Sequence, residues 1–173
     1  MLQPITSIGR SLYRIVFRAG SPQRIQYSDR LLLTAVFVLP AAAIGALVLF
    51  FEASVLEIGL VLFTLLAGTY IGAALLTRRA SRARLRTSLL SFLLILDAAG
   101  VLLIAFAPAT HIPGARIVVA VAVAGATLLG TSNIVQFTLA SGRLAAVLVT
   151  LAFAVALGAF FTVLRPLLMT VFS

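Results

Sequence analysis

The sequence predicts an all-α, polytopic membrane protein with five transmembrane helices and an amphipathic surface helix at its N-terminus. The first reason is composition, since 62% of the 173 residues are hydrophobic and only 10% are charged. Soluble domains are about 45–50% apolar and about 25% charged, so this chain has too few polar residues to cover a surface in water. The second reason is that its apolar residues form runs of about 20, enough to cross a hydrocarbon core about 30 Å thick.

The expected transmembrane helices follow from five apolar runs. They are Leu31–Phe51, Val55–Leu76, Ser88–Ala107, Ile117–Leu139 and Leu144–Leu164. A lipid-exposed segment must satisfy its own backbone hydrogen bonds, and these runs are too long and too uniformly apolar for barrel strands, so we expect helices. We divide the last two runs at 140–143, because Arg143 in the middle of the membrane would cost several kcal/mol.

The positions of the arginines predict the orientation of these helices. All thirteen basic residues are Arg, against four acidic residues. Eleven of them lie in the segment 1–30, in the connection 78–87 or at residue 143. Cytoplasmic loops collect basic residues, so we expect a bacterial inner-membrane protein with a cytoplasmic N-terminus and a periplasmic C-terminus. Residues 1–30 would form a cytoplasmic helix and linker, and residues 31–173 the transmembrane domain.

The net charge of +9 predicts contact with anionic lipid. The arginines lie between apolar runs rather than along one soluble face, so headgroups are the expected counter-ions and nucleic acid is not an expected partner. The arginines that we expect to contact headgroups lie on the N-terminal helix and in the second connection: Arg10, Arg14, Arg18, Arg78, Arg79 and Arg82. In the second connection this contact would follow from their role in fixing the orientation of two spans.

The segment Pro4–Ala19 has the pattern of an amphipathic helix. Its apolar residues recur at helical spacing on one face: Ile5, Ile8, Leu12, Ile15, Val16 and Ala19. The arginines at every fourth position lie beside that face, which is typical of a helix in the plane of the membrane surface. The alternative is a helix that packs on the cytoplasmic ends of the spans. We favour the membrane surface, and both arrangements can hold together.

Asp97 is the most informative single residue, because it lies near the middle of the third span. A charge there costs at least about 2.5–3.5 kcal/mol, and intramembrane ionisable groups are candidates for function. No basic residue lies at a similar depth, so we expect an uncharged carboxyl that donates a hydrogen bond. Counting residues from the cytoplasmic ends places four polar residues near that depth: Asn133, Ser132, Gln136 and Tyr70.

This predicted polar cluster has two interpretations. In the first, Asp97 and its neighbours join helices through hydrogen bonds worth about 0.6–2 kcal/mol each. In the second, Asp97 binds a proton or a cation along a pathway. A relay normally needs a chain of ionisable groups, and the spans offer one such residue, so we favour the structural interpretation.

Small residues predict close helix packing at two places. Gly68 and Gly72 form a GxxxG pattern in the second span, and Gly130 lies on a face of small residues in the fourth. Small residues let helices approach closely. Whether the contacts lie within one chain or between copies is left open by the sequence.

The sequence offers no candidate catalytic or metal-binding residues. Cysteine is absent, which excludes disulfides and thiolate metal sites. The single histidine, His111, has no companion of the kind that metal binding or catalysis requires. No phosphate-binding loop, dinucleotide fingerprint or nucleophile elbow is present. We therefore expect a protein that is not an enzyme and has no cofactor.

Two short stretches resemble small proteobacterial inner-membrane proteins with no assigned activity. They are Arg18–Gln23 followed by Tyr27 and Ser28, and Arg86–Leu90 followed by Asp97. The layout of five spans with a cytoplasmic N-terminus is similar to the Yip family (Ypt-interacting proteins), whose eukaryotic members act in vesicle trafficking. The resemblance implies a fold, and it implies no catalytic residues.

Two functional hypotheses follow from the sequence. The first is a non-enzymatic membrane protein that organises or supports a membrane-protein partner or a larger complex, or that forms a homo-oligomer. The second is a small transporter or channel subunit in which Asp97 couples to a proton or a cation.

Overall fold

The chain folds into helices in a computed structural model that describes residues 3–18, 22, 28–77 and 81–172. Within these ranges it forms α-helices, short 3-10 turns and connecting turns, with no strand. The helices are α1 (Gln3–Phe17), α2 (Asp29–Leu49), α3 (Val55–Thr77), α4 (Arg82–Phe106), the 3-10 helix η2 (Ala107–His111), α5 (Ala115–Leu139) and α6 (Arg143–Phe172).

Four described helical stretches have the length and composition of membrane spans, and a fifth apolar stretch is shorter. Four described stretches are long and apolar enough to cross a bilayer: Asp29–Leu49, Ala83–His111, Ala115–Leu139 and Arg143–Phe160. A shorter apolar stretch, Val55–Ile71, lies within α3, which has 23 residues in all. At 1.5 Å per residue, α3 is about 34 Å long. The predicted all-α, polytopic membrane fold is confirmed.

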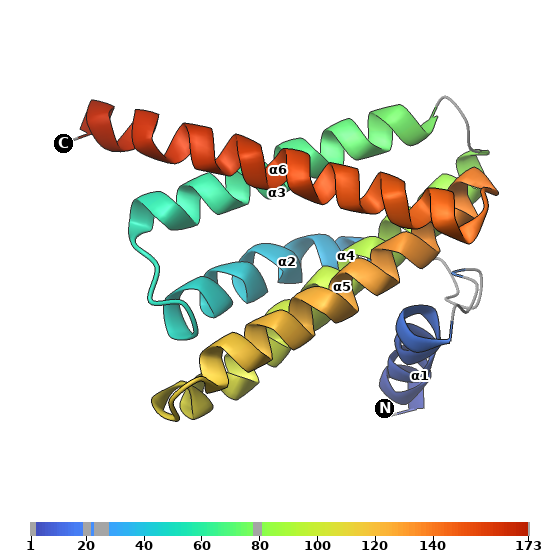
Figure 1. Cartoon of the computed structure of the whole chain (residues 1–173). Coiled ribbons are helices and arrows are strands. Elements are labelled where there is room, and N and C mark those ends of the chain that lie inside the picture. Colours follow the sequence, from blue (N-terminus) through green and yellow to red (C-terminus); the bar gives the residue numbers. More distant parts are fainter. Residues whose placement is uncertain (1–2, 19–21, 23–27, 78–80, 173) are drawn as a thin grey trace.

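The helices pack in a definite order (Figure 1). Helix α4 lies between α2 and α5, α6 follows beside α5, and α3 packs mainly on α6. Helices α2, α4 and α6 all begin at one end of the bundle, which we call the arginine-rich end because Arg30, Arg84, Arg86 and Arg143 lie there. We call the other the far end. The short helix α1 lies beside α5 toward the arginine-rich end.

Local hydrogen bonds explain where three of the helices begin. At the start of α2, the Ser28 side chain accepts from the Leu31 N–H. At the start of α4, the Ser81 side chain accepts from the Arg84 N–H. At the start of α3, Ser54 and Glu57 form a reciprocal capping box: the Ser54 N–H donates to Glu57 Oε2 over 3.0 Å, and the Glu57 N–H donates to Ser54 Oγ over 3.3 Å. Each bond satisfies a backbone donor that the first helical turn leaves free.

The tightest helix contact joins α2 and α4 through small residues. A Cβ built on Gly100 would lie 2.9 Å from the Cβ of Ala42 and 3.0 Å from the Ala42 carbonyl oxygen. A Cβ built on Gly45 would lie 2.7 Å from the side chain of Ile104. The two backbones can approach this closely only because these positions carry no side chain.

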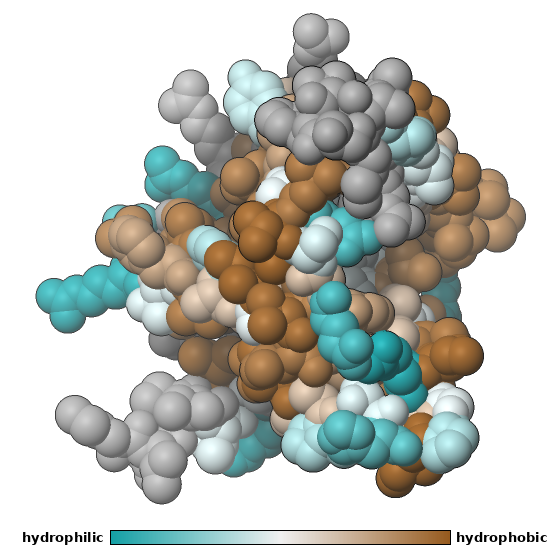
Figure 2. All heavy atoms as spheres, turned by 90° about the vertical axis from the view of Figure 1, so that its left-hand side faces the viewer, coloured by the Kyte–Doolittle hydropathy of each residue, from teal (hydrophilic) through white to brown (hydrophobic). Residues whose placement is uncertain are grey.

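Large apolar side chains cover the outside of the bundle. Phe37 is 76% exposed and Val55 is 87% exposed. Figure 2 views the far end and shows broad hydrophobic areas, with hydrophilic residues gathered in separate patches between and beside them. Lipid tails are the solvent that such a surface fits.

Candidate functional site

Helix α1 packs into the helical bundle. Ile15 is 0% exposed and belongs to the main apolar cluster, together with Ala35 of α2, Leu90 of α4 and Ile134 of α5. Leu12 and Val16 pack against the same cluster. Of the two arrangements that the sequence left open, contact with the spans is present. Contact of α1 with a membrane surface stays a prediction.

Asn133 of α5 caps the C-terminal end of α1. Its side-chain Nδ2 donates to the Ile15 carbonyl over 2.6 Å and lies 3.4 Å from the Val16 carbonyl. Both carbonyls belong to the last turn of α1, which ends at Phe17. The last four carbonyls of a helix have no partner within the helix, and in lipid each unsatisfied group would cost several kcal/mol. Asn133 therefore supplies the donor that allows α1 to end against the side of a span.

Gly130 lies one turn before Asn133 and leaves room for α1. A Cβ built on Gly130 would lie 3.0 Å from Val16 Cγ2 and 2.7 Å from Ile95 Cδ1. Gly130 therefore faces both α1 and α4. Together, Gly130 and Asn133 form what we call the α1 seat.

The seat lies well inside the span. Ser88 of α4 and Thr138 of α5 are level, since their hydroxyl oxygens are 2.6 Å apart. Asn133 is five residues before Thr138, and Arg86 is two residues before Ser88. At 1.5 Å per residue, Asn133 is therefore about 10 Å further into the bundle than Arg86.

The outer face of α1 is aromatic and basic. Tyr13 and Phe17 are exposed, and their ring centroids are 5.2 Å apart. The Arg18 guanidinium lies 6.0 Å from the centre of the Tyr13 ring. At about 100° per residue, these rings lie opposite Ile15, and the arginines occupy the next sector. All three arginines are exposed: Arg10, Arg14 and Arg18. Helix α1 thus has one face for the bundle, one aromatic face and one basic face.

Asp97 and Asn133 are not brought together, although the sequence places them at one depth. Ile95 of α4 faces Gly130 of α5, whereas Gly100 of α4 faces Ala42 of α2. At about 100° per residue, the direction of Asp97 differs from that of Ile95 by about 200° around the helix axis. It differs from that of Gly100 by only about 60°. Asp97 therefore shares the α2 face of α4, while Asn133 serves α1. Depth can be counted from a sequence, but the direction in which each span faces cannot.

The other three members of the predicted cluster are also separate from Asp97. Tyr70 is 78% exposed on the outside of α3. The Ser132 hydroxyl donates to the Leu129 carbonyl of its own helix. Gln136 is half-buried, and its backbone carbonyl accepts from Ala140 and Ser141 at the end of α5. Among the described residues, no hydrogen bond joins Asp97 to any of the other four members of the predicted cluster.

Asp97 has an environment of its own. The residue is 7% exposed, and Oδ1 is buried without a hydrogen-bond partner among the described residues. Gly100, one turn away, packs on the backbone of α2. A buried polar atom without a partner is rare in native proteins and calls for an explanation.

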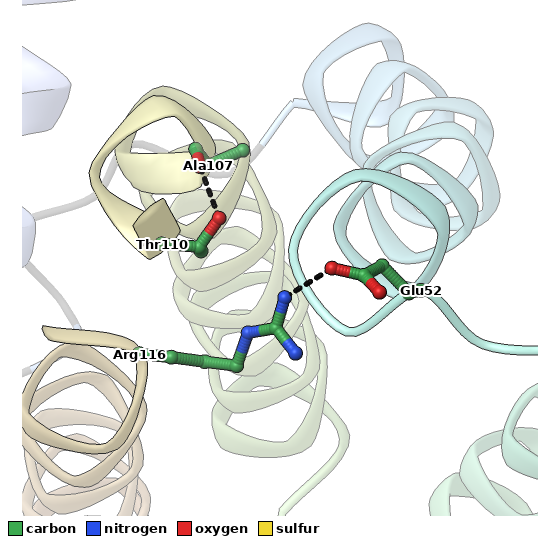
Figure 3. Close-up of polar contacts among 4 residues, drawn as sticks. All are labelled: Glu52, Ala107, Thr110 and Arg116. Carbon is green, nitrogen blue, oxygen red and sulfur yellow. Dashed lines mark hydrogen bonds and ion pairs between the residues drawn. The ribbon is translucent and has the colours of Figure 1, made fainter. Parts of the chain in front are cut away.

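Polar contacts that the sequence analysis did not identify join other parts of the bundle. The Ser88–Thr138 pair is buried and links α4 to α5. At the far end, Arg116 of α5 forms an ion pair with Glu52 in the turn between α2 and α3, and Thr110 donates to the Ala107 carbonyl within η2 (Figure 3). The capping box at the start of α3 was readable as an S-x-x-E pattern, whereas the contacts between helices had no local signal.

The remaining predicted residues fall into two groups. Gly68 packs within the chain, since a Cβ built on it would lie 3.0 Å from Leu157 of α6. Gly72 lies on α3 and Arg82 begins α4, but their surroundings lie outside the described residues, as do Arg78 and Arg79 altogether. Headgroup contact by the arginines stays a prediction.

These observations define the class of protein: an all-α, polytopic membrane protein with an N-terminal helix seated on its spans. Among the described residues, no group of three or more His, Asp or Glu side chains could bind a metal ion. Comparison with protein-family models, curated proteins and solved structures finds no match to this chain. The likeness to the Yip family stays a prediction.

Proposed function

We propose that the protein is a non-enzymatic integral membrane protein that organises or supports a membrane partner at the cytoplasmic leaflet. The observation that carries this proposal is the seating of α1. Asn133 and Gly130 fix a short helix against the spans, and the exposed side of that helix is basic and aromatic. A helix fixed in this way presents one constant surface to lipid headgroups and to a partner.

The chemistry of the exposed face of α1 fits the cytoplasmic membrane surface. Tyrosine is enriched where membrane meets water, because its ring is apolar and its hydroxyl is polar. Basic residues near an anionic leaflet contribute about 1 kcal/mol each, so Arg10, Arg14 and Arg18 together would contribute about 3 kcal/mol. In this proposal the arginine-rich end is cytoplasmic, the N-terminus is inside and the C-terminus is periplasmic.

The proposed partner is a membrane protein or a second copy of the chain. The connections at the far end are short: residues 50–54 join α2 to α3, and residues 107–114 join α4 to α5. Most of the surface is therefore on the spans or at the arginine-rich end. A partner would have to bind one of these two surfaces.

The experiment compares three tagged proteins extracted gently at their natural expression level. They are the wild type, a variant with Arg10, Arg14 and Arg18 changed to glutamine, and a charge-matched control with Arg84, Arg86 and Arg143 changed to glutamine. Co-purified proteins and lipids are quantified by mass spectrometry. We expect a stoichiometric partner and retained anionic lipid with the wild type, and a selective loss of both with the α1 variant.

Two outcomes would count against the proposal. One is a wild-type protein that purifies alone as a monomer. The other is an equal loss with both variants, because it would show that α1 has no special part and that total charge alone matters.

A second candidate function is transport of a proton or cation, with Asp97 as the coupling residue. The specific observation in its favour is the buried Oδ1 of Asp97, which has no partner among the described residues. The substitution Asp97→Asn keeps the shape of the side chain and removes its titration. If the protein is reconstituted in vesicles, transport should stop in this variant, whereas a purely structural role should tolerate the amide.

A further inference from the structure

We propose that the carboxyl of Asp97 is a proton-binding site inside the bundle, on the face of α4 that packs on α2. The inference deepens the second candidate function and rests on it for a biological role. The ligand is the proton itself: an ionised carboxylate accepts a proton on one oxygen and becomes a neutral carboxylic acid. The site is defined by a residue that is 7% exposed, with Oδ1 buried and unpartnered among the described residues.

The α2 face of α4 offers Asp97 only apolar surroundings. Leu93 and Gly100 are its neighbours on this face, and both are buried. Across from Gly100 lies Ala42. Between Thr34 and Glu52, α2 and the turn that follows it contain no polar side chain. The carboxyl therefore has no polar or charged side chain from this part of α2 to compensate it.

The two serine hydroxyls of α4, which are the hydroxyls nearest to Asp97 along this helix, lie away from its α2 face. Ser88 is nine residues from Asp97, which is about 180° around the helix, and Ser91 is six residues away, about 120° off. Ser88 is already bonded to Thr138, and Ser91 donates to the Thr87 carbonyl. None of these hydroxyls is available to Asp97.

Charged groups on the helices around α4 lie at the ends of the bundle. On α2 none lies between Arg30 and Glu52, and on α5 none lies between Arg116 and Arg143. On α4 itself the nearest is Arg86, eleven residues or about 16 Å along the axis. On α1, α3 and η2, the charged or titratable side chains whose surroundings are described lie at helix ends or on exposed faces: Arg10, Tyr13, Arg14 and Arg18 of α1, Glu57 and Tyr70 of α3, and His111 of η2.

This environment suits a proton better than a metal cation. A cation that leaves water needs several oxygen ligands in place of its hydration shell. The described residues include no group of three or more His, Asp or Glu that could supply them. A proton needs one oxygen, and its binding removes the charge that is costly in this environment. The structure therefore favours a proton at Asp97.

The test uses dicyclohexylcarbodiimide, an apolar reagent that reaches buried carboxylic acids from the lipid phase. The protonated carboxyl adds across one C=N bond of the reagent, and the adduct rearranges to a stable N-acylurea with no leaving group. The full-length protein in lipid nanodiscs is treated briefly, digested and mapped by mass spectrometry. We expect label on Asp97 in preference to the three carboxylates at helix ends, Asp29, Glu52 and Glu57.

Variants and conditions make the test specific. Label should be lost in Asp97→Asn and kept in Asp97→Glu, and Glu57→Gln should not change it. Only the protonated form reacts, so labelling should decrease as pH rises. Replacing choline chloride with sodium or potassium chloride at equal ionic strength should not change the rate. The thermal unfolding transition of each variant shows whether it is folded.

Three outcomes would overturn the inference. In the first, Asp97 is not labelled in the folded protein although it reacts in the unfolded protein. In the second, sodium or potassium suppresses the label. In the third, the carboxylates at helix ends are labelled as strongly as Asp97. The proton site and the transport function can fail separately. Selective label on Asp97 without proton flux in vesicles would keep the site and reject transport.

Discussion

Replacing Asn133 with leucine should release the C-terminal turn of α1 from α5. Leucine has the same branching and the same number of side-chain heavy atoms as asparagine, so the change mainly replaces the amide donor with an apolar group. The Ile15 carbonyl, now bonded over 2.6 Å, and the Val16 carbonyl at 3.4 Å would lose their shared partner. Other contacts of Ile15 within the apolar cluster would remain, so α1 should dock more weakly and the bundle should still fold.

The size of the effect follows from those two carbonyls. Removing one partner of a buried hydrogen bond costs about 1–3 kcal/mol. Hydrogen bonds between membrane helices contribute about 0.6–1.7 kcal/mol by double-mutant cycles, which supports the lower part of that range. A cost of about 1–3 kcal/mol corresponds to a change of about 5- to 150-fold in the docking equilibrium.

The assay uses the absence of cysteine from the chain. A cysteine placed at position 15 (Ile15→Cys) is fully buried when α1 is docked, because Ile15 is 0% exposed. A polar maleimide then reacts only with the undocked fraction, so its rate should rise by about 5- to 150-fold when Asn133→Leu is added. In a matched protein, Gly142→Cys lies in the exposed turn between α5 and α6, which α1 does not cover, and its rate should change little.

Two further variants test whether the effect is specific to the residues of α5 that contact α1. Ser132→Ala removes only a bond within α5, to the Leu129 carbonyl, and should leave the protection of position 15 unchanged. Gly130→Leu places a side chain against Val16 and Ile95 and should expose position 15 as Asn133→Leu does. The reasoning is refuted if position 15 stays equally protected in Asn133→Leu, because the amide would then contribute nothing to docking.

The remaining predictions concern packing and polar contacts between other helices. Gly100→Ala should lower the free energy of unfolding by about 1–3 kcal/mol, because its Cβ would meet the backbone of α2, whereas Gly125→Ala points into open space and should not destabilise the protein in a steric trap or thermal assay. A double-mutant cycle of Ser88→Ala and Thr138→Val should give a coupling of about 0.6–1.7 kcal/mol, and a value near zero would show that their contact is not stabilising. Glu52→Gln breaks an exposed ion pair, so it should cost about 0–1 kcal/mol and less at high salt; a larger, salt-independent loss would contradict this.

The spans were predictable from the sequence because lipid imposes a strong local rule. A helix that faces lipid must be apolar for about 20 residues, and this pattern placed α3 from Val55 and the end of α5 at Leu139 as the structure has them. The start of α4 was less predictable. It begins at Arg82, six residues before the expected Ser88, because Ser81 caps a helical turn that extends beyond the apolar run.

The candidate site was less predictable, because it depends on which way each helix faces. The sequence identified Asn133 and Asp97 as unusual, but it predicted that these two side chains would contact each other. The true partner of Asn133 is the backbone of α1, and a backbone carbonyl has no residue signature. Helix α1 itself was expected from its periodicity, whereas the depth of its seat depends on Gly130 and on the register of α4 and α5.

The most direct test of the central claim is the depth of α1 in the membrane. A nitroxide label at Phe17→Cys, in protein reconstituted in bilayers, reports collisions with oxygen, which concentrates in lipid, and with a polar nickel chelate, which stays in water. An interfacial helix lies about 5–10 Å into the boundary of headgroups and acyl chains, which agrees with the seat about 10 Å from the level of Arg86 along the spans. The account predicts that oxygen relaxes the label more than nickel does, and that Asn133→Leu shifts the label toward water. A label at Phe17 that behaves as if fully in water in the wild type would contradict the account.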